Sequence, residues 1–258
     1  MSAEFDGLVA VVTGGASGIG LATAQVLAER GATVAVFDLG HGDLPAGLKP
    51  YVADVTDRVS LEVAVAAVAS DLGRLDIVVN NAGISAVGTV EANDDATWAR
   101  VLDVNVTGMA RMTAAALPWL RESPSAAVVN VSSIAALNGL PQRALYSASK
   151  GAVLALTFAM ATDHVREGIR INCVAPGTVA TSFVDRLLQN FTDPVAERAA
   201  MDARQAIGRM VRPEEVAAAI AYLASPLSGA TTGTSLDVDG GATHLRVRPV
   251  EEAAKVKP

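Results

Sequence analysis

The sequence predicts a single doubly wound α/β domain, in which helices cover both faces of a seven-stranded parallel sheet. Two observations carry this prediction: short apolar runs alternate with longer stretches of helical period, and most of these runs end at Gly or a polar residue. Such alternation is typical of βαβ units, whose strands are buried on both faces. Because no linker rich in Pro, Gly or Ser divides the 258 residues, we expect one domain over 1–258 with its core at 5–241.

Seven apolar runs have the length of buried strands. Most are rich in Val and Ile, as the strands of a parallel sheet usually are. They lie at 8–13, 33–38, 49–55, 75–80, 126–132, 170–175 and 235–238. We therefore expect seven strands in one sheet.

Helical periodicity fills most of the intervals between these strands. The periodic stretches lie at 18–30, 57–72, 94–121, 146–167 and 213–224. The last of them begins with Pro213, Glu214 and Glu215. Proline fits the first helical position and acidic side chains complement the positive end of the helix dipole, so we expect a helix to begin there.

Two stretches depart from the alternation. Residues 178–212 lie between the sixth strand and the last helix, and a connection of this length is usually functional or mobile, so we expect it to be a substrate segment. Residues 242–258 follow the last strand and have no strand pattern or clear helical period. We interpret them as a loosely ordered tail, with a subunit contact as the alternative.

Composition and charge exclude several function classes. The chain has 20 Lys and Arg against 27 Asp and Glu, a net charge of −7 and no basic cluster, which argues against nucleic acid or a membrane as partner. The single cysteine, Cys173, cannot form an internal disulfide, and no Cys/His cluster has metal-ligand spacing. We find no signal-like amino end and no apolar run of about 18 residues. We therefore expect a cytoplasmic protein without a metal.

A glycine-rich turn follows the first predicted strand and opens a helix. Thr-Gly-Gly-Ala-Ser-Gly-Ile-Gly at 13–20 places glycines where the chain must turn sharply and let a pyrophosphate approach backbone N–H groups. Tight turns need glycine for steric reasons alone, but here an acidic residue, Asp38, ends the next strand. A carboxylate there accepts both hydroxyls of an adenosine ribose and repels a 2′-phosphate. The pattern predicts a Rossmann-type site for NAD, and a solvated Asp38 is the alternative interpretation.

Tyr146 and Lys150 are spaced to lie on one face of a predicted helix. A tyrosine has a pKa near 10, and lowering it to about 7 for proton transfer needs ~4 kcal/mol. An ammonium group at ~4 Å supplies about that much at an effective dielectric near 20. The pair is therefore able to act as an acid or base, and the alternative is a packed Tyr beside a Lys that reaches solvent.

Polar side chains follow the fourth and fifth predicted strands. Ser133 comes after the fifth, and Asn81 stands in the run Asn-Asn-Ala-Gly that follows the fourth. Ligands of parallel sheets bind beyond the carboxyl ends of the strands, so Ser133 and Tyr146 are placed to converge on one substrate oxygen. Asn105 lies in a helical pattern although Asn is a poor helix former. A polar role in the site is one explanation, and a solvent-facing Asn is the other.

Together these motifs resemble the classical short-chain dehydrogenase/reductase family across residues 5–241. The matching features are the turn at 13–20, Asp54-Val55, Asn-Asn-Ala-Gly at 80–83, Asn105, the set Ser133, Tyr146 and Lys150, and Pro-Gly-Thr-Val-Ala-Thr at 176–181. The resemblance implies an enzyme that interconverts a secondary alcohol and a ketone by hydride transfer. Family members that prefer NADP often carry a basic residue in the glycine turn or after the second strand, and this chain has none at either place.

The resemblance also implies a role for each matching residue. Tyr146 would exchange a proton with the substrate hydroxyl and Ser133 would bind the same oxygen, while Lys150 would hold the nicotinamide ribose and lower the pKa of Tyr146. Asn105 would support a water that links Lys150 to solvent. Cofactor contacts are implied, together with Tyr146 and Lys150, for Gly14, Ser17, Gly18, Ile19, Gly20, Asp38, Asp54, Val55, Asn81, Ala82, Gly83, Pro176, Gly177, Val179 and Thr181.

Three arginines are candidates for binding a substrate carboxylate, because a guanidinium fork suits a carboxylate. Arg143 lies close before Tyr146, and Arg186 and Arg204 lie in the substrate segment. The surrounding sequence is similar to the subgroup that oxidises 3-hydroxybutyrate or 2-keto-3-deoxy sugar acids, so a hydroxy acid is the expected small-molecule substrate. In the alternative, Arg186 and Arg204 pair on a solvated helix face with Asp185, Glu197 or Asp202.

Two other functions stay open. One is a reductase for a neutral steroid, polyketide or 3-oxoacyl ketone, with structural arginines. The other is a non-catalytic NAD-binding protein, which the complete set of Ser133, Tyr146 and Lys150 disfavours. Family members are usually tetramers or dimers, so the resemblance implies a homo-oligomer built on residues 94–121 and 146–167.

Overall fold

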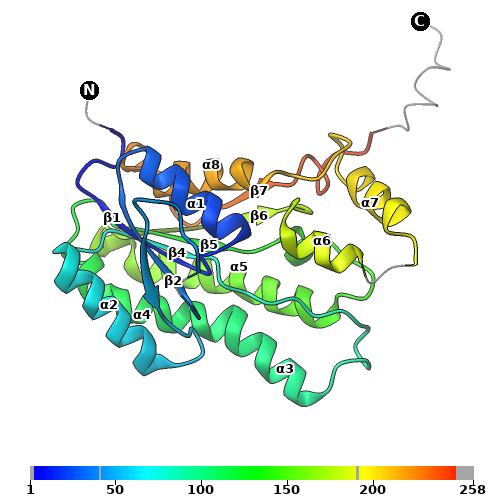
Figure 1. Cartoon of the computed structure of the whole chain (residues 1–258), viewed down its shortest axis with the longest axis horizontal. Helices are drawn as coiled ribbons and strands as arrows, with labels where there is room; N and C mark the ends of the chain where they lie inside the picture. The colour runs from blue at the N-terminus through cyan, green and yellow to red at the C-terminus, as the bar shows by residue number, and fades with distance from the viewer. Residues whose placement is uncertain (1–2, 41, 190–191, 248–258) are drawn as a thin grey trace, which may run out of the picture.

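The computed structural model describes residues 3–40, 42–189 and 192–247, with the backbone alone at Phe183, Arg186 and Leu187. Its centre is a seven-stranded sheet in the order β3-β2-β1-β4-β5-β6-β7 (Figure 1). Every neighbouring pair of strands runs parallel. The strands are β1 (Val9–Thr13), β2 (Thr33–Asp38), β3 (Lys49–Val52), β4 (Ile77–Asn80), β5 (Ala127–Val131), β6 (Arg170–Pro176) and β7 (Ser235–Val238). The predicted doubly wound sheet is confirmed.

Helices cover both faces of the sheet, as Figure 1 shows. Residues of α1 (Gly18–Glu29) and α8 (Pro213–Ala224) form one core with the strands. Residues of α2 (Arg58–Leu72), α4 (Gly108–Leu120) and α5 (Ala144–His164) form the other. Successive residues of β1 alternate between the two cores, because strand side chains point to opposite faces in turn.

The helix starts follow simple capping chemistry. The carboxylate of Asp57 accepts hydrogen bonds from the backbone N–H groups of the first turn of α2. Pro213 occupies the first turn of α8, where the sequence predicts it, and Glu215 Oε2 accepts from Arg212 N at 2.8 Å. Hydrogen bonds from Arg209 and Arg212 hold the pKa of Glu215 well below its usual range. The predicted bounds of α8 are confirmed.

The predicted helix over 94–121 is two helices joined by a π-helical turn. The two helices are α3 (Asp95–Leu102) and α4, and the turn between them is η1 (Asp103–Thr107). The turn contains Asn105, whose side chain is fully buried and bonded to Ile84 and Ser149, so tertiary contacts hold the extra residue in the turn.

The predicted strand over 49–55 is shorter in the structure. β3 ends at Val52, because Asp54 Oδ1 accepts from both the backbone N and the hydroxyl of Thr56, at 2.8 and 2.7 Å, and turns the chain.

The substrate segment 178–212 contains two helices that the sequence did not predict. They are α6 (Ser182–Leu188) and α7 (Pro194–Ala203), and Asp193 caps the second of them. A small apolar cluster holds the segment together, and it comprises Val184, Leu188, Met201 and Met210. The two helices have only 7 and 10 residues, so each spans too few turns to give a clear helical period in the sequence.

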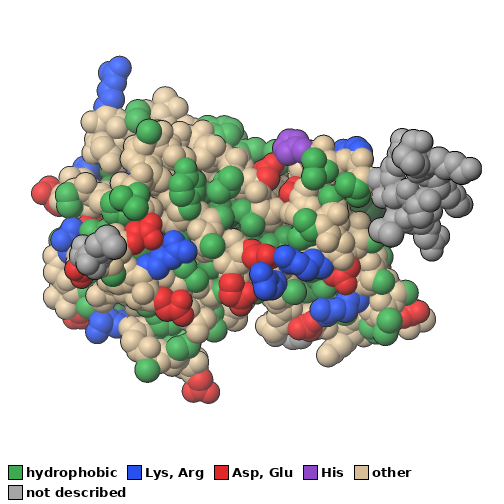
Figure 2. Space-filling model, turned by 90° about the horizontal axis from the view of Figure 1, so that it is seen from above, with side chains coloured by type: hydrophobic (Ala, Val, Ile, Leu, Met, Phe, Trp, Pro, Cys, Tyr) green, Lys and Arg blue, Asp and Glu red, His purple; other side chains and the backbone are tan. Residues whose placement is uncertain are grey.

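Shorter turns complete the chain: η2 (Ile134–Ala136), η3 (Val165–Glu167) and η4 (Pro226–Ser228) are 3-10 turns. In the tail, Thr243 Oγ1 accepts from Asn138 Nδ2 at 3.0 Å, which connects residues 242–247 to the loop after β5. Residues 248–258 of the predicted tail lie outside the described residues. The face seen in Figure 2 has acidic and basic side chains interspersed with apolar ones.

One helical stretch, Ala144–Glu167, has the length and composition needed to cross a membrane, with a hydropathy of 1.3. This finding differs from our expectation that no apolar run reaches about 18 residues. In the structure α5 packs against β6 and η2 and places Lys150 in the protein interior. These contacts make it a core helix of the domain.

Candidate active site

A cavity of about 470 Å³ opens at the carboxyl ends of β1, β4, β5 and β6. Most of the predicted site residues line it. They are Gly14, Ser17, Gly18, Ile19, Asn81, Gly83, Ser133, Arg143, Tyr146, Lys150, Pro176, Gly177, Val179, Thr181 and Arg204. The structure therefore brings together motifs that are far apart in the sequence.

Several predicted residues do not line this cavity. They are Gly20, Asp38, Asp54, Val55, Ala82 and Asn105. Arg186 lies in α6, and its side chain is outside the described part of the structure. The structure gives most of the others a clear role next to the cavity, as the following paragraphs describe.

The glycine turn has the shape that a pyrophosphate needs. Gly14 and Gly18 have φ of +62° and +54°, which side chains rarely adopt, and Gly18 begins α1. A Cβ on Gly14 would lie 3.0 Å from Ala82 Cα, so the turn packs closely against the loop after β4. Exposed backbone N–H groups at the start of a helix fit a dinucleotide, and these residues would hold it.

Thr13 and Asn81 join the glycine turn to the loop after β4. Asn81 Nδ2 donates to the backbone oxygens of Thr13 and Gly14, both at 3.0 Å. Thr13 Oγ1 in return accepts from the backbone N of Asn81 and of Ala82, at 3.0 and 3.1 Å. Thr13 begins the motif at 13–20, but sequence reasoning gave its side chain no role.

Gly20 has a packing role. A Cβ on Gly20 would lie 2.5 Å from Asn81 Nδ2 and would also meet the carbonyl of Gly14. The residue therefore lets α1 approach the two loops, which explains why it lies outside the cavity.

Asp38 faces the glycine turn from the end of β2. Its Oδ2 accepts from Ala16 N at 3.1 Å and its Oδ1 from Leu39 N at 2.9 Å. The carboxylate thus lies beside the turn that would hold the dinucleotide, and it is only partly buried.

Asp54 and Val55 follow β3 and lie outside the cavity lining. Hydrogen bonds from Thr56 hold the pKa of the Asp54 carboxyl below its usual range, with smaller contributions from Arg100 and Arg111. A Cβ on Gly108 would lie 3.0 Å from Val55 Cβ, so Val55 packs against the start of α4.

The segment that follows β6 also lines the cavity. Gly177 packs against Asp239, whose Cα would lie 3.0 Å from a Cβ on that glycine. Val179 forms an isolated parallel bridge with Val211. A Cβ on Gly18 would lie 3.5 Å from Thr181 Cγ2, which places the start of α6 beside the glycine turn.

Lys150 lies beneath Tyr146 on α5. Its side chain is 4% exposed, and Nζ donates to Val131 O at 2.9 Å. The ammonium nitrogen is 5.7 Å from the centroid of the Tyr146 ring. Burial lowers the pKa of Lys150 to about 8.

The pKa of Tyr146 is raised, opposite to the direction that the sequence arithmetic gave for its pairing with Lys150. Burial raises this pKa, and interactions with the Ser133 hydroxyl and with Arg143 lower it by less. The arithmetic counted the attraction of a nearby cation and omitted the loss of water around the phenolate. Ser133 Oγ also accepts from Ala135 N at 3.1 Å, which orients the hydroxyl at the start of η2.

Asn105 is a positioning residue of the structure. Its Oδ1 accepts from Ile84 N at 2.8 Å, and its Nδ2 donates to Ile84 O at 2.9 Å and to Ser149 Oγ at 3.0 Å. The side chain therefore ties the loop after β4 to α5, next to Lys150. A solvent-facing Asn105 is excluded, since it is fully buried.

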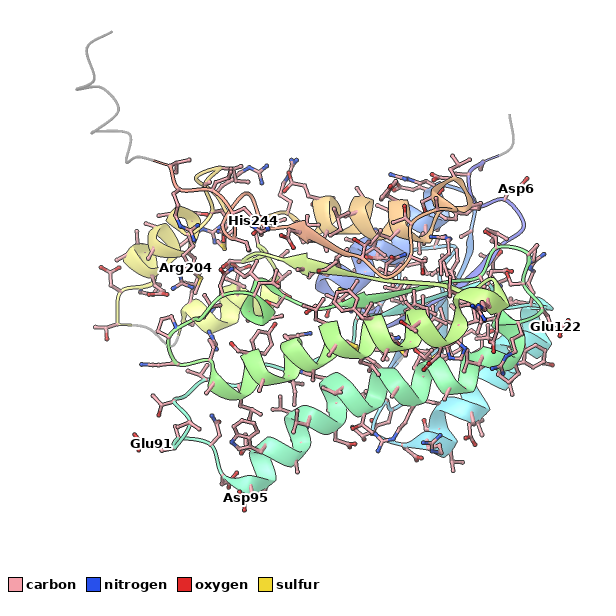
Figure 3. The ribbon with its side chains drawn as sticks, turned by 180° about the vertical axis from the view of Figure 1, so that it is seen from behind. Asp6, Glu91, Asp95, Glu122, Arg204 and His244 are labelled. Carbon is pink, nitrogen blue, oxygen red and sulfur yellow. The ribbon has the colours of Figure 1, made fainter. Side chains whose placement is uncertain are left out.

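Among the side chains that the structure describes, the charged ones that line the cavity are Arg143, Lys150 and Arg204. Arg143 Nη1 donates to Ser85 Oγ at 3.4 Å and to Ala86 O at 3.3 Å. Burial lowers the pKa of Arg143, and the like charge of Arg204 adds to this effect. Arg204 at the end of α7 lies on the same side of the molecule as the start of α5 (Figure 3).

Arg204 also has an acidic partner. Its Nη2 lies 3.2 Å from Glu197 Oε1, a pairing that our solvated-face alternative includes. The other proposed acids are engaged elsewhere: Asp185 pairs with Arg198 at 3.4 Å, and Asp202 Oδ1 accepts from Met210 N. Arg204 therefore lines the cavity and forms a surface ion pair at the same time.

Sequence reasoning missed the apolar wall of the cavity. This wall includes Ile84, Ile134, Leu140, Val184 and Met201. They come from four separate segments, and no local pattern distinguishes them from core residues. Cys173 is buried in β6, where burial raises the pKa of its thiol.

Comparison with known proteins agrees with this geometry. A family model described as enoyl-(acyl carrier protein) reductase matches residues 14–243. The chain is 43% identical to a cis-4-hydroxycyclohexanecarboxylate dehydrogenase from Sinomonas cyclohexanicum, over 95% of this chain and 100% of the relative. It is 38% identical to a meso-2,3-butanediol dehydrogenase from Serratia marcescens, over 95% and 98% of the two chains.

The fold has solved counterparts as well. An aldohexose dehydrogenase from Thermoplasma acidophilum superposes with a TM-score of 0.90 at 28% identity, over 97% of this chain and 99% of that one. The chain therefore belongs to the classical short-chain dehydrogenase/reductase family, and it is an oxidoreductase that acts on CH–OH groups with a nicotinamide cofactor.

Proposed function

We propose that the protein is an NAD-dependent dehydrogenase that interconverts a hydroxy acid and the corresponding keto acid. One observation carries the proposal: Ser133, Tyr146 and Lys150 share a single cavity with the glycine turn and with Arg143 and Arg204. The cavity thus combines residues for a dinucleotide site, for proton transfer and for binding an anion.

Tyr146 and Ser133 act on the reacting oxygen. In the direction of oxidation, the substrate O–H bond breaks and its proton passes to the Tyr146 phenolate, while Ser133 Oγ hydrogen-bonds the same oxygen. NAD held at the glycine turn would supply the acceptor for the hydride that leaves the substrate carbon as the C=O bond forms. Reduction reverses each transfer, with Tyr146 as the proton donor.

Lys150 prepares Tyr146 for this role. Its ammonium group is held by Val131 O and lies near enough to the Tyr146 ring to favour the phenolate. The same nitrogen is placed to bind the ribose next to the nicotinamide. A pKa near 8 leaves Lys150 mostly protonated at neutral pH.

Asp38 supports NAD over NADP. Its carboxylate lies beside the glycine turn, where it would accept hydroxyl groups of the adenosine ribose and repel a 2′-phosphate. In the sequence no Lys or Arg occurs after Asp38 until Lys49, so the segment that follows β2 carries no cation to bind that phosphate.

Arg143 and Arg204 support a carboxylate on the substrate. Among the described residues, those that contact the Arg143 guanidinium engage only Nη1, which leaves the rest of its fork for a ligand. One relative is named for cis-4-hydroxycyclohexanecarboxylate, a compound that has both a hydroxyl and a carboxylate. The relative named for meso-2,3-butanediol supports the alternative, a neutral alcohol, with both arginines structural.

Replacing Tyr146 tests the proton-transfer assignment. We expect Tyr146→Phe to lower kcat by at least about 1000-fold, because no other group replaces the positioned acid and base. NADH binding, followed by fluorescence, should stay within about threefold of the wild-type affinity, since the Tyr146 hydroxyl is only one of many implied cofactor contacts. Turnover within about tenfold of wild type contradicts the assignment.

The same assay identifies the cofactor. Oxidation of a panel of hydroxy acids is followed with NAD and with NADP in parallel. A kcat/KM that is higher with NADP contradicts the role of Asp38, and oxidation of neutral alcohols alone contradicts the role of the arginines.

A further inference from the structure

We propose that Glu197 determines the charge class of the substrate: by pairing with Arg204, it removes one positive charge from the anion site, which favours a monocarboxylate over a dianion. This inference rests on the proposed function and adds a specificity-determining residue to it.

Glu197 and Arg204 lie on one face of α7. They are seven residues apart, which is close to two helical turns, so their side chains project in the same direction. Arg204 Nη2 and Glu197 Oε1 are 3.2 Å apart. Glu197 is the more buried partner, with its side chain 24% exposed against 45% for Arg204. The carboxylate is therefore fixed behind the guanidinium that lines the cavity.

Both charges act on Arg143 across the cavity. The pKa of Arg143 is lowered by the positive charge of Arg204 and raised by the negative charge of Glu197. Arg143, Arg204 and Glu197 thus form one electrostatic group, although Arg143 comes from the start of α5 and the other two from α7.

Lys150 is separate from the charged group formed by Arg143, Arg204 and Glu197. The described residues that line the cavity include Lys150, but this cation lies beneath Tyr146 and is occupied with Val131 O. The guanidinium groups of Arg143 and Arg204 both interact with the carboxylate of Glu197. A monocarboxylate that binds Arg143 and Arg204 neutralises this group, whereas a dianion leaves a buried negative charge without a partner.

The test measures binding and does not depend on turnover. Butyrate, a monoanion, and succinate, a dianion of the same carbon number, are titrated into the enzyme–NADH complex at low ionic strength, with NADH fluorescence as the readout. Wild-type enzyme should bind butyrate more tightly. Glu197→Gln should raise the succinate-to-butyrate affinity ratio by about fivefold, because one removed charge acts twice as strongly on a dianion.

Two variants serve as controls. Asp185→Asn removes the same charge from the neighbouring helix α6, where Asp185 pairs with Arg198 and not with Arg204, and it should leave the ratio unchanged. Glu197→Asp keeps the charge and should keep the wild-type preference. Thermal unfolding of each variant confirms that the fold is intact.

The outcomes separate this inference from the proposed function. If Arg143→Ala and Arg204→Ala weaken both ligands but Glu197→Gln leaves the ratio unchanged, the charge-setting role is wrong and the anion site stands. If Glu197→Gln weakens both ligands equally, Glu197 only supports α7, and the inference is also wrong. If the arginine variants leave butyrate binding unchanged, the hydroxy-acid proposal and the inference both fail.

Discussion

Arg143 shows how much a single residue depends on its covalent neighbours. It is the residue before α5 and lies three positions ahead of Tyr146, so the chain itself fixes its distance from the reacting centre. Its backbone forms an isolated bridge with Gly88, and Gln142 before it has a φ of +55°. These constraints direct the guanidinium into the cavity, where burial already lowers its pKa.

Truncating Arg143 distinguishes an acidic substrate from a neutral one. We expect Arg143→Ala to lower kcat/KM for a hydroxy acid by about 10- to 100-fold, the usual effect of losing a hydrogen bond to a charged group. The amide of the same acid, which lacks the charge, should lose less than about threefold. Steady-state kinetics on both compounds measure the difference, and an equal loss on the two contradicts carboxylate binding.

The glycine turn and the loop after β4 behave as one element. The sheet order places β1 beside β4 at the point where the chain changes direction, so these two loops meet at the carboxyl edge of the sheet. Thr13 and Asn81 bond the loops to each other, and Gly20 lets α1 approach them. The dinucleotide site is therefore pre-formed by contacts between the loops.

A methyl group on Gly20 tests this close packing. Gly20→Ala should lower the free energy of unfolding by about 1–3 kcal/mol, because the added Cβ overlaps the Gly14 carbonyl and Asn81 Nδ2. It should also weaken NADH binding, since the turn must shift. Urea unfolding and NADH titration measure the two effects.

Gly229 provides the matched control. It has a negative φ, is exposed, and has only Pro226 O within 4 Å of the Cβ position, at 3.9 Å. Gly229→Ala should leave NADH binding unchanged and should not reduce stability. Equal behaviour of the two variants contradicts the packing role of Gly20.

At the scale of the whole molecule, the layer of helices α4 and α5 leaves apolar side chains at the surface. Trp119, Phe158 and Val165 are 39%, 43% and 47% exposed. Only 39% of the most apolar window of Ala144–Glu167 is buried within the chain. We propose that this face is the contact of a homo-oligomer, in agreement with the expectation from residues 94–121 and 146–167.

A charge on this face should disrupt such an assembly. Phe158→Glu should lower the molar mass measured by light scattering after gel filtration, because a carboxylate buried in an interface has no partner. Val59→Glu places the same group on α2, at a residue that is 64% exposed, and should leave the mass unchanged. A wild-type protein that elutes as a monomer contradicts the proposal.

The sequence by itself determined the elements whose pattern is local. Short runs that end at a polar residue or Gly can be recognised locally, so β2 and β7 have the predicted bounds, and α8 begins at the predicted Pro213. The motif residues around the glycine turn, Ser133 and Tyr146 are likewise short-range patterns, and the structure gathers most of them around one cavity. Local chemistry is sufficient here because each pattern records the environment of neighbouring residues.

Only the tertiary structure decided the features that depend on distant contacts. Asn105 occupies a π-helical turn because Ile84 and Ser149 bond its side chain. The raised pKa of Tyr146 depends on burial by several segments, and sequence spacing measures only its nearest charge. The charges of Glu197 and Arg204 act on Arg143 because the fold brings the end of α7 and the start of α5 to the same cavity. Desolvation and charge act through space, and a linear pattern does not record them.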